Sequence, residues 1–150
     1  MSSLVYNDLW ASCVVFCNTM ITAIKTASLS SDMEFVNLDA HADLTSLSGK
    51  DVLGMKGFAL NFSEQVIDVT VLFGVSTLHD TNLLRLNKSI AMLVNELFPT
   101  SQIAVKDADT GAVLGWMVVQ DGTAVLPVAS TTSRPIQYVM VTMATSQFVS

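Results

Sequence analysis

The sequence is poor in charged residues. Asp, Glu, Lys and Arg together make up 13% of the 150 residues, whereas globular proteins usually carry roughly 25%. Apolar residues make up 51%, and this combination excludes an intrinsically disordered chain. A chain of this length forms one domain that needs no disulfide or metal to stabilise its core. A surface so poor in charge indicates either a large core or contacts with other subunits.

Basic residues are especially scarce. The chain has 7 Lys and Arg against 13 Asp and Glu, and its net charge is −6 at pH 7. The basic residues are scattered and form no patch, which excludes a protein that grips nucleic acid through the phosphates. An acidic protein can still surround DNA without holding it, because like charges repel.

Cysteine is also rare. Cys13 and Cys17 stand in an apolar stretch without a C-x-x-C pattern, so we interpret them as core residues of an intracellular protein. The uncharged run over 9–24 is shorter than the roughly 20 residues that span a bilayer. Asp8 precedes this run without a nearby Lys or Arg, unlike the start of a signal peptide. We expect a buried or interface helix here and no membrane association.

Hydrophobic spacing predicts the secondary structure. Apolar residues at helical spacing predict helices over 3–27 and 78–98, the second capped by Asp80 or Thr81 and stopped by Pro99. Alternating residues and turn signals predict strands over 33–38, 57–75, 102–106, 112–119, 124–129 and 136–145, the later ones as a meander.

This order of elements predicts an α+β fold with an antiparallel β-sheet and two main helices packed on one face. We expect a single domain over 1–150. A long loop at about 39–56 and a frayed tail at about 146–150 complete this prediction.

One cluster has the residue types of a catalytic or metal site. Asp39, His41 and Asp43 would share a face in an extended segment, where they could hold a divalent cation, or an Asp could orient the His as a base. A solvated polar loop explains the same residues, because no further ligands can be named. The chain has no phosphate-binding loop and no nucleophile elbow. We therefore expect neither catalysis nor a cofactor.

The layout of the chain carries a family resemblance. A first helix is followed by a β-rich middle that ends in Gln65–Phe73, a helix over 82–98, a hairpin and a closing strand over Pro135–Met143. In this layout the chain resembles the tail terminator proteins of long-tailed bacteriophages. The resemblance covers most of the chain.

The resemblance implies a structural virion protein of the tail or neck, assembled in the host cytoplasm. It implies a homo-oligomeric, hexameric ring that caps the tail tube, joins it to the head connector and lets DNA pass through without specific binding. We expect subunit contacts at Trp10, Phe16, Ile136, Tyr138 and Met140, with the last strand offering an exposed edge to a neighbour.

Other functions remain open at this point. One is another virion component, such as a head-completion, tube or baseplate protein. A second is a metal-dependent enzyme that uses Asp39, His41 and Asp43. A third is a module that binds an apolar ligand in a pocket between helix and sheet.

Overall fold

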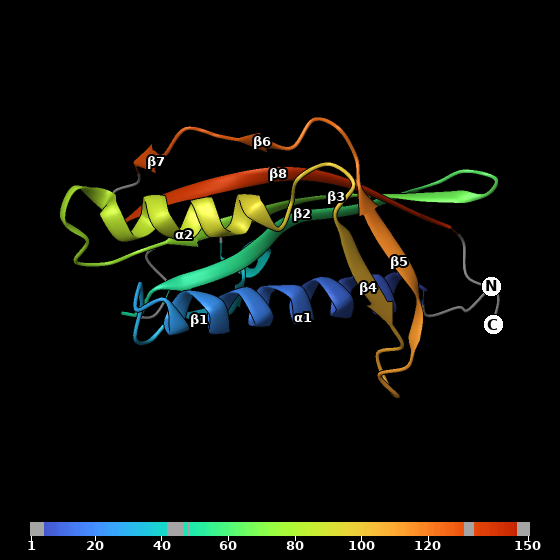
Figure 1. Cartoon of the computed structure of the whole chain (residues 1–150), viewed down its shortest axis with the longest axis horizontal. Helices are drawn as coiled ribbons and strands as arrows, with labels where there is room; N and C mark the ends of the chain where they lie inside the picture. The colour runs from blue at the N-terminus through green and yellow to red at the C-terminus, as the bar shows by residue number, and fades with distance from the viewer. Residues whose placement is uncertain (1–4, 42–46, 48, 131–133, 147–150) are drawn as a thin grey trace.

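The computed structural model describes residues 5–41, 47, 49–130 and 134–146. In this part of the chain, helices α1 (Val5–Thr26) and α2 (Leu84–Asn95) accompany a long, curved sheet (Figure 1). The strands are β1 (Glu34–Asn37), β2 (Val52–Phe62), β3 (Val66–Ser76), β4 (Gln102–Lys106), β5 (Val113–Val119), β6 (Ala124–Val125), β7 (Ala129–Ser130) and β8 (Pro135–Ser146). Short 3-10 helices occupy Leu38–Ala40 and Thr81–Leu83.

The sheet has the strand order β1-β2-β3-β8-β5-β4. Each neighbouring pair in this order is antiparallel except β1 and β2, which are parallel. The longest ladder joins β3 to β8, from Val66 opposite Ser146 to Val75 opposite Gln137. In Figure 1 these two strands run along the molecule with both helices beside them. The predicted α+β class is confirmed.

One face of the sheet carries the core. Every second residue of β3 is buried, as expected for a strand with one covered face. Both helices bury residues in the same cluster as these strand positions, so both cover this one face. The members with no exposed surface include Leu9, Cys13, Cys17 and Ile24 of α1, Leu86 and Leu93 of α2, Phe73 and Val75 of β3, and Val139, Val141 and Met143 of β8.

The first helix is long and apolar enough to cross a membrane by length and composition. In this fold it covers the sheet with Leu9, Cys13 and Cys17, which have no exposed surface. Both cysteines are free and buried, as predicted, and burial raises the pKa of the Cys13 thiol to about 12. The thiol therefore stays protonated, and it packs as a small apolar side chain.

The closing strand corrects one prediction. β8 lies between β3 on one side and β5, β6 and β7 on the other, so it offers no exposed edge. The segment predicted as a returning meander strand over 124–129 pairs with β8 instead of β5. The chain after β5 therefore follows β8 in two short strands, and Pro127 lies between them, where a missing N–H interrupts pairing.

Two predicted boundaries also change. Helix α2 begins at Leu84 rather than at residue 78, because His79, Asn82 and Leu83 have positive φ angles that a helix does not accept. The predicted loop at about 39–56 ends earlier, since β2 begins at Val52. Residues 42–46 and 48 of that loop, and residues 147–150 of the predicted tail, lie outside the described part of the chain.

Two glycines make room for the buried side chain of Leu38 on the sheet face that points away from the helices. Leu38 is buried although it belongs to a short 3-10 helix at the sheet edge. A Cβ on Gly54 would lie 2.1 Å from the Val36 carbonyl oxygen and 2.9 Å from Leu38 Cγ. A Cβ on Gly74 would lie 2.8 Å from Tyr138 Cε1 and 2.9 Å from Leu38 Cδ1. Both positions therefore require glycine for a close approach.

Alanine at these positions tests this packing. Gly54→Ala should lower the free energy of unfolding by about 3 kcal/mol, because the new methyl group meets backbone that cannot move aside. Gly49→Ala is the matched control, since a Cβ there meets nothing within 4 Å, and it should change stability by less than about 0.5 kcal/mol. Urea unfolding followed by circular dichroism measures both. Equal stability of the two variants would contradict the close approach of β1 to Gly54.

Candidate functional site

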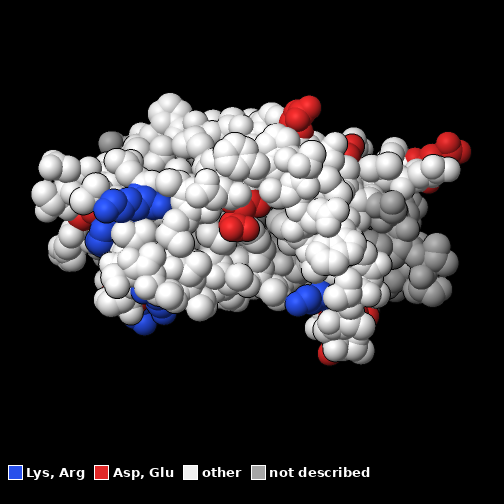
Figure 2. Space-filling model, in the orientation of Figure 1, with Lys and Arg blue, Asp and Glu red and all other residues white. Residues whose placement is uncertain are grey.

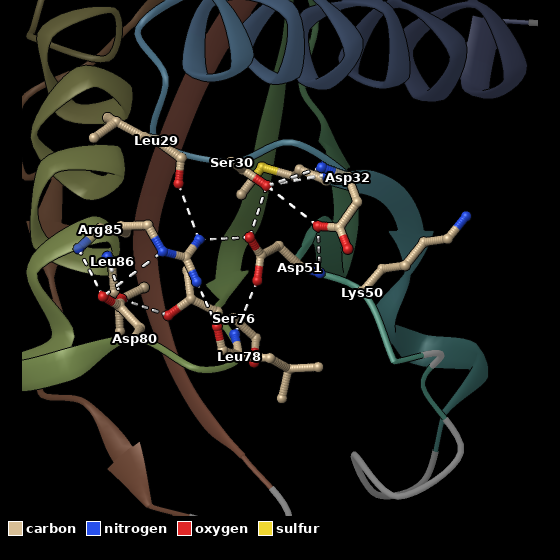
Figure 3. Close-up of polar contacts among 12 residues, drawn as sticks. Leu29, Ser30, Asp32, Lys50, Asp51, Ser76, Leu78, Asp80, Arg85 and Leu86 are labelled. Carbon is tan, nitrogen blue, oxygen red and sulfur yellow. Dashed lines mark hydrogen bonds and ion pairs between the residues drawn. The ribbon is translucent and has the colours of Figure 1, made fainter.

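An ion pair between the half-buried Arg85 and the buried Asp51 joins distant segments at one end of the molecule (Figure 3). Arg85 of α2 donates from Nη1 to Asp51 Oδ2 at 2.6 Å and to the Leu29 carbonyl oxygen at 2.9 Å. Asp51 also accepts from Ser30 Oγ at 2.7 Å and from the Leu78 N–H at 2.8 Å. The pair thus ties the start of α2 to the loop after α1 and to the start of β2.

Asp80 holds the same end of α2. Its carboxylate accepts the backbone N–H groups of Arg85 at 3.0 Å and Leu86 at 2.8 Å. Asp80 thus satisfies the first turn of the helix, as a cap does, although Leu83 and not Asp80 occupies the N-cap position. Thr77 Oγ1 donates to it as well, at 2.8 Å. Burial by itself would raise the pKa of Asp80, but these hydrogen bonds outweigh that effect and lower it. The carboxylate is therefore ionised at neutral pH, where it complements the helix N-terminus.

A groove lies between α1, α2 and β4. Its volume is about 460 Å³, within the range of small-molecule sites. Its lining combines apolar and polar side chains, the apolar ones being Val15, Phe16, Met20, Ala23, Met92, Ile103 and Ala104. The polar ones are Ser12, Thr19, Asn95, Glu96, Gln102 and Lys106. Ser12 closes one part of the groove, because its Oγ accepts the Lys106 N–H at 2.9 Å and so covers the edge of β4.

The opposite face of the sheet carries a second apolar surface. Side chains between the core positions of β3 and β8 point away from the helices, and there Met140 is 45% exposed beside Leu72. On β5, Trp116 points to the same side and is 51% exposed. We name Leu72, Trp116, Val118, Met140 and Ala144 the outer sheet surface. Among the described residues of β2, β3, β5 and β8 that point to this side, only Lys56 and Asp68 carry a charge.

The structure separates the predicted interface residues. Phe16 lines the groove and packs its ring 5.3 Å from that of Phe73, whereas Met140 belongs to the outer sheet surface. Tyr138 is half-buried, and Lys56 Nζ lies 5.7 Å from the centroid of its ring. Trp10 is half-buried near the start of α1. Ile136 is only 2% exposed, so its expected place in an interface is corrected to the interior.

Of the three residues considered for a metal site in the first loop, only Asp39 and His41 belong to the described part of the chain. Asp39 Oδ2 accepts the Gly57 N–H at 3.0 Å, and the His41 N–H donates to the Leu38 carbonyl oxygen at 3.2 Å. Asp43 lies outside the described residues. Within the described ranges, no three His, Cys, Asp or Glu side chains lie close enough to hold a metal ion.

Trp116 and Val15 are surface residues that sequence reasoning passed over. The alternation of β5 carried a signal, because Met117 and Val119 are core positions and Trp116, which directly precedes Met117, has the opposite phase of this alternation. Val15 stands between Val14 and Phe16 in an apolar helix, so spacing alone could not show which of these three residues is the most exposed.

Comparisons with known proteins add no further information on the site. No protein-family model matches the chain, and a search of curated proteins finds no match either. The inference of assembly therefore rests on the surfaces described above.

The Arg85–Asp51 pair is predicted to determine stability at low pH. Burial would raise the pKa of Asp51, but hydrogen bonds from Ser30, Arg85 and Leu78 outweigh it and lower the pKa. The stabilisation is complete above the ordinary aspartate pKa of about 4 and is lost as the pH falls through the lowered value. Asp51→Ala should lower the unfolding free energy at pH 7 by about 2 kcal/mol, because it leaves the half-buried Arg85 with only the Asp80 carboxylate, 3.9 Å away.

Thermal unfolding at pH 7 and at pH 3 measures this effect. Lys50→Gln is the control, since it removes only the exposed Lys50–Glu34 pair at 3.7 Å, which is worth less than about 1 kcal/mol. The stability difference between wild type and Asp51→Ala should shrink at the lower pH. A difference that is the same at both pH values would contradict the role of the ionised carboxylate.

Proposed function

We propose that this protein is a structural virion subunit of a bacteriophage tail or neck, similar to a tail terminator, that assembles into a ring. The observation that carries the proposal is a pair of different apolar surfaces on opposite faces of one sheet. The groove runs between the two helices and along β4, and the outer sheet surface lies on the face of β3, β5 and β8 that points away from the helices. Exposed apolar surfaces of this kind are typical of protein contacts.

Two different surfaces favour a ring over a simple dimer. A two-fold dimer uses the same patch on both subunits, whereas a ring or filament needs two patches that complement each other. In the proposed contact, Trp116 and Met140 of one subunit pack against Val15, Phe16 and Met92 of the next. The groove is concave, and the exposed Trp116 provides an aromatic anchor of the kind that dominates interface energy.

Charge supports passage of DNA through such a ring. The net charge is −6, and Figure 2 shows isolated charged side chains separated by wide uncharged surface on one side of the molecule. An acidic subunit without a basic patch does not retain phosphates. The hexameric number, the tail-tube and head-connector partners and the place in the virion come from the family resemblance and are part of the proposal.

Single substitutions test the contact. Val15→Glu in the groove and Trp116→Glu on the outer sheet surface should each place a carboxylate in an apolar interface and weaken assembly about 100-fold or more, which corresponds to about 3 kcal/mol. Light scattering after size-exclusion chromatography should give an oligomer for the wild type and a monomer for either variant. Leu84→Glu is the control, because Leu84 is exposed at the start of α2 and outside both surfaces. A wild-type protein that stays monomeric at high concentration would contradict the proposal.

The shape of the assembly distinguishes the virion roles. Negative-stain electron microscopy should show closed rings with a central opening, and rings added to tail tubes should sit at one end and stop elongation. Stacking of the protein into long tubes would instead identify a tube component. A compact particle without a central opening would contradict a DNA-conducting ring.

A further inference from the structure

Three aromatic rings form a box near the start of α1. Tyr6 and Trp10 stand one helical turn apart, so their side chains share a face of the helix. The ring of Phe58 lies 5.3 Å from that of Tyr6 and 5.5 Å from that of Trp10, at interplanar angles of 84° and 81°. The three rings line a pocket of about 310 Å³ together with Asn37 and Asp39.

An irregularity in the backbone of β2 places Phe58 beside the other two rings. The pairing of β2 with β3 is interrupted between Lys56 and Ala59, and Gly57 has a φ of 65°. A glycine at positive φ is typical of a β-bulge, which re-aims the neighbouring side chain. Here that neighbour is Phe58, which packs against α1. The interruption therefore brings the third ring to the other two.

The carboxylate in the pocket is held in place by the same turn. Asp39 Oδ2 accepts the Gly57 N–H at 3.0 Å, and the Asp39 N–H donates to Asn37 Oδ1 at 3.1 Å. The ion pairs that join Lys50 to Glu34 and Arg85 to Asp51 and Asp80 do not involve Asp39. Asp39 therefore contributes a carboxylate to the same pocket that the three rings line.

We propose that this aromatic box binds a quaternary ammonium group. Such a cation is attracted to several aromatic faces and to a nearby carboxylate, and its methyl groups need no hydrogen-bond partners. A hard metal ion fits the box poorly, because it requires six or more oxygen ligands and the box offers one carboxylate and one amide oxygen. The site is independent of the proposed ring, since none of its residues lines the groove or belongs to the outer sheet surface.

Isothermal titration calorimetry with choline tests the site. Choline should bind the wild type, and 3,3-dimethyl-1-butanol, its neutral isostere, should bind at least about tenfold more weakly because it lacks the charge that the rings attract. Asp39→Asn should weaken choline binding about threefold or more, and Tyr6→Ala about tenfold. Tyr6 is 55% exposed, so its removal should leave the fold intact. Phe62→Ala, an exposed aromatic residue on the same strand outside the box, should leave binding unchanged.

Two outcomes overturn the proposal: no heat of binding with choline, or equal affinity for choline and its neutral isostere. The source of the group is distinguished by a second titration with a peptide that carries trimethyllysine. Tighter binding of the peptide indicates a methylated protein side chain as the ligand, and tighter binding of choline indicates a small molecule. Either result supports the box, provided that Tyr6→Ala weakens binding of the ligand concerned.

Discussion

The contact between Arg85 and Asp51 is the constraint on which the arrangement of this molecule depends. These two side chains join the start of α2 to the loop after α1 and to the first residue before β2, three places that are far apart in the sequence. Because Asp51 is buried, its charge is tolerated only while all of its hydrogen bonds are made. The pair therefore determines where α2 lies beside α1, and with it the shape of the groove between them.

Much of the fold could be predicted from the sequence because its elements have strong periodic patterns. Helix α1 and strand β4 were predicted within two residues of their observed ends. The start of α2 was not, because helical spacing of apolar residues does not reveal the positive φ angles at Asn82 and Leu83 or the local hydrogen bonds of Asp80 and Arg85 beside them. The prediction that β8 lies at an edge of the sheet was wrong for a similar reason. Alternation shows that a strand exists but carries no information about its neighbours.

The candidate surfaces were predicted less well than the fold. Phe16 and Met140 lie on the two surfaces proposed for assembly, but sequence spacing could not show that these surfaces lie on opposite faces of the sheet. Ile136 was expected at an interface because it stands in the closing strand, and pairing with β7 helps to bury it instead. The aromatic box joins Tyr6 and Trp10 to Phe58 across a long stretch of chain through a local irregularity in β2. Gly57 within the strand is a sequence signal for such an irregularity, but it does not show which rings the irregularity brings together.

The central claim is that the groove of one subunit receives the outer sheet surface of another. Native mass spectrometry of a mixture tests it most directly, with Val15→Glu, which retains an intact outer sheet surface, and Trp116→Glu, which retains an intact groove. Each variant alone should be a monomer. Their mixture should form a one-to-one heterodimer that does not grow, because only one complementary pair of surfaces remains. A mixture that stays monomeric, or a single variant that still pairs with itself, would contradict this account of assembly.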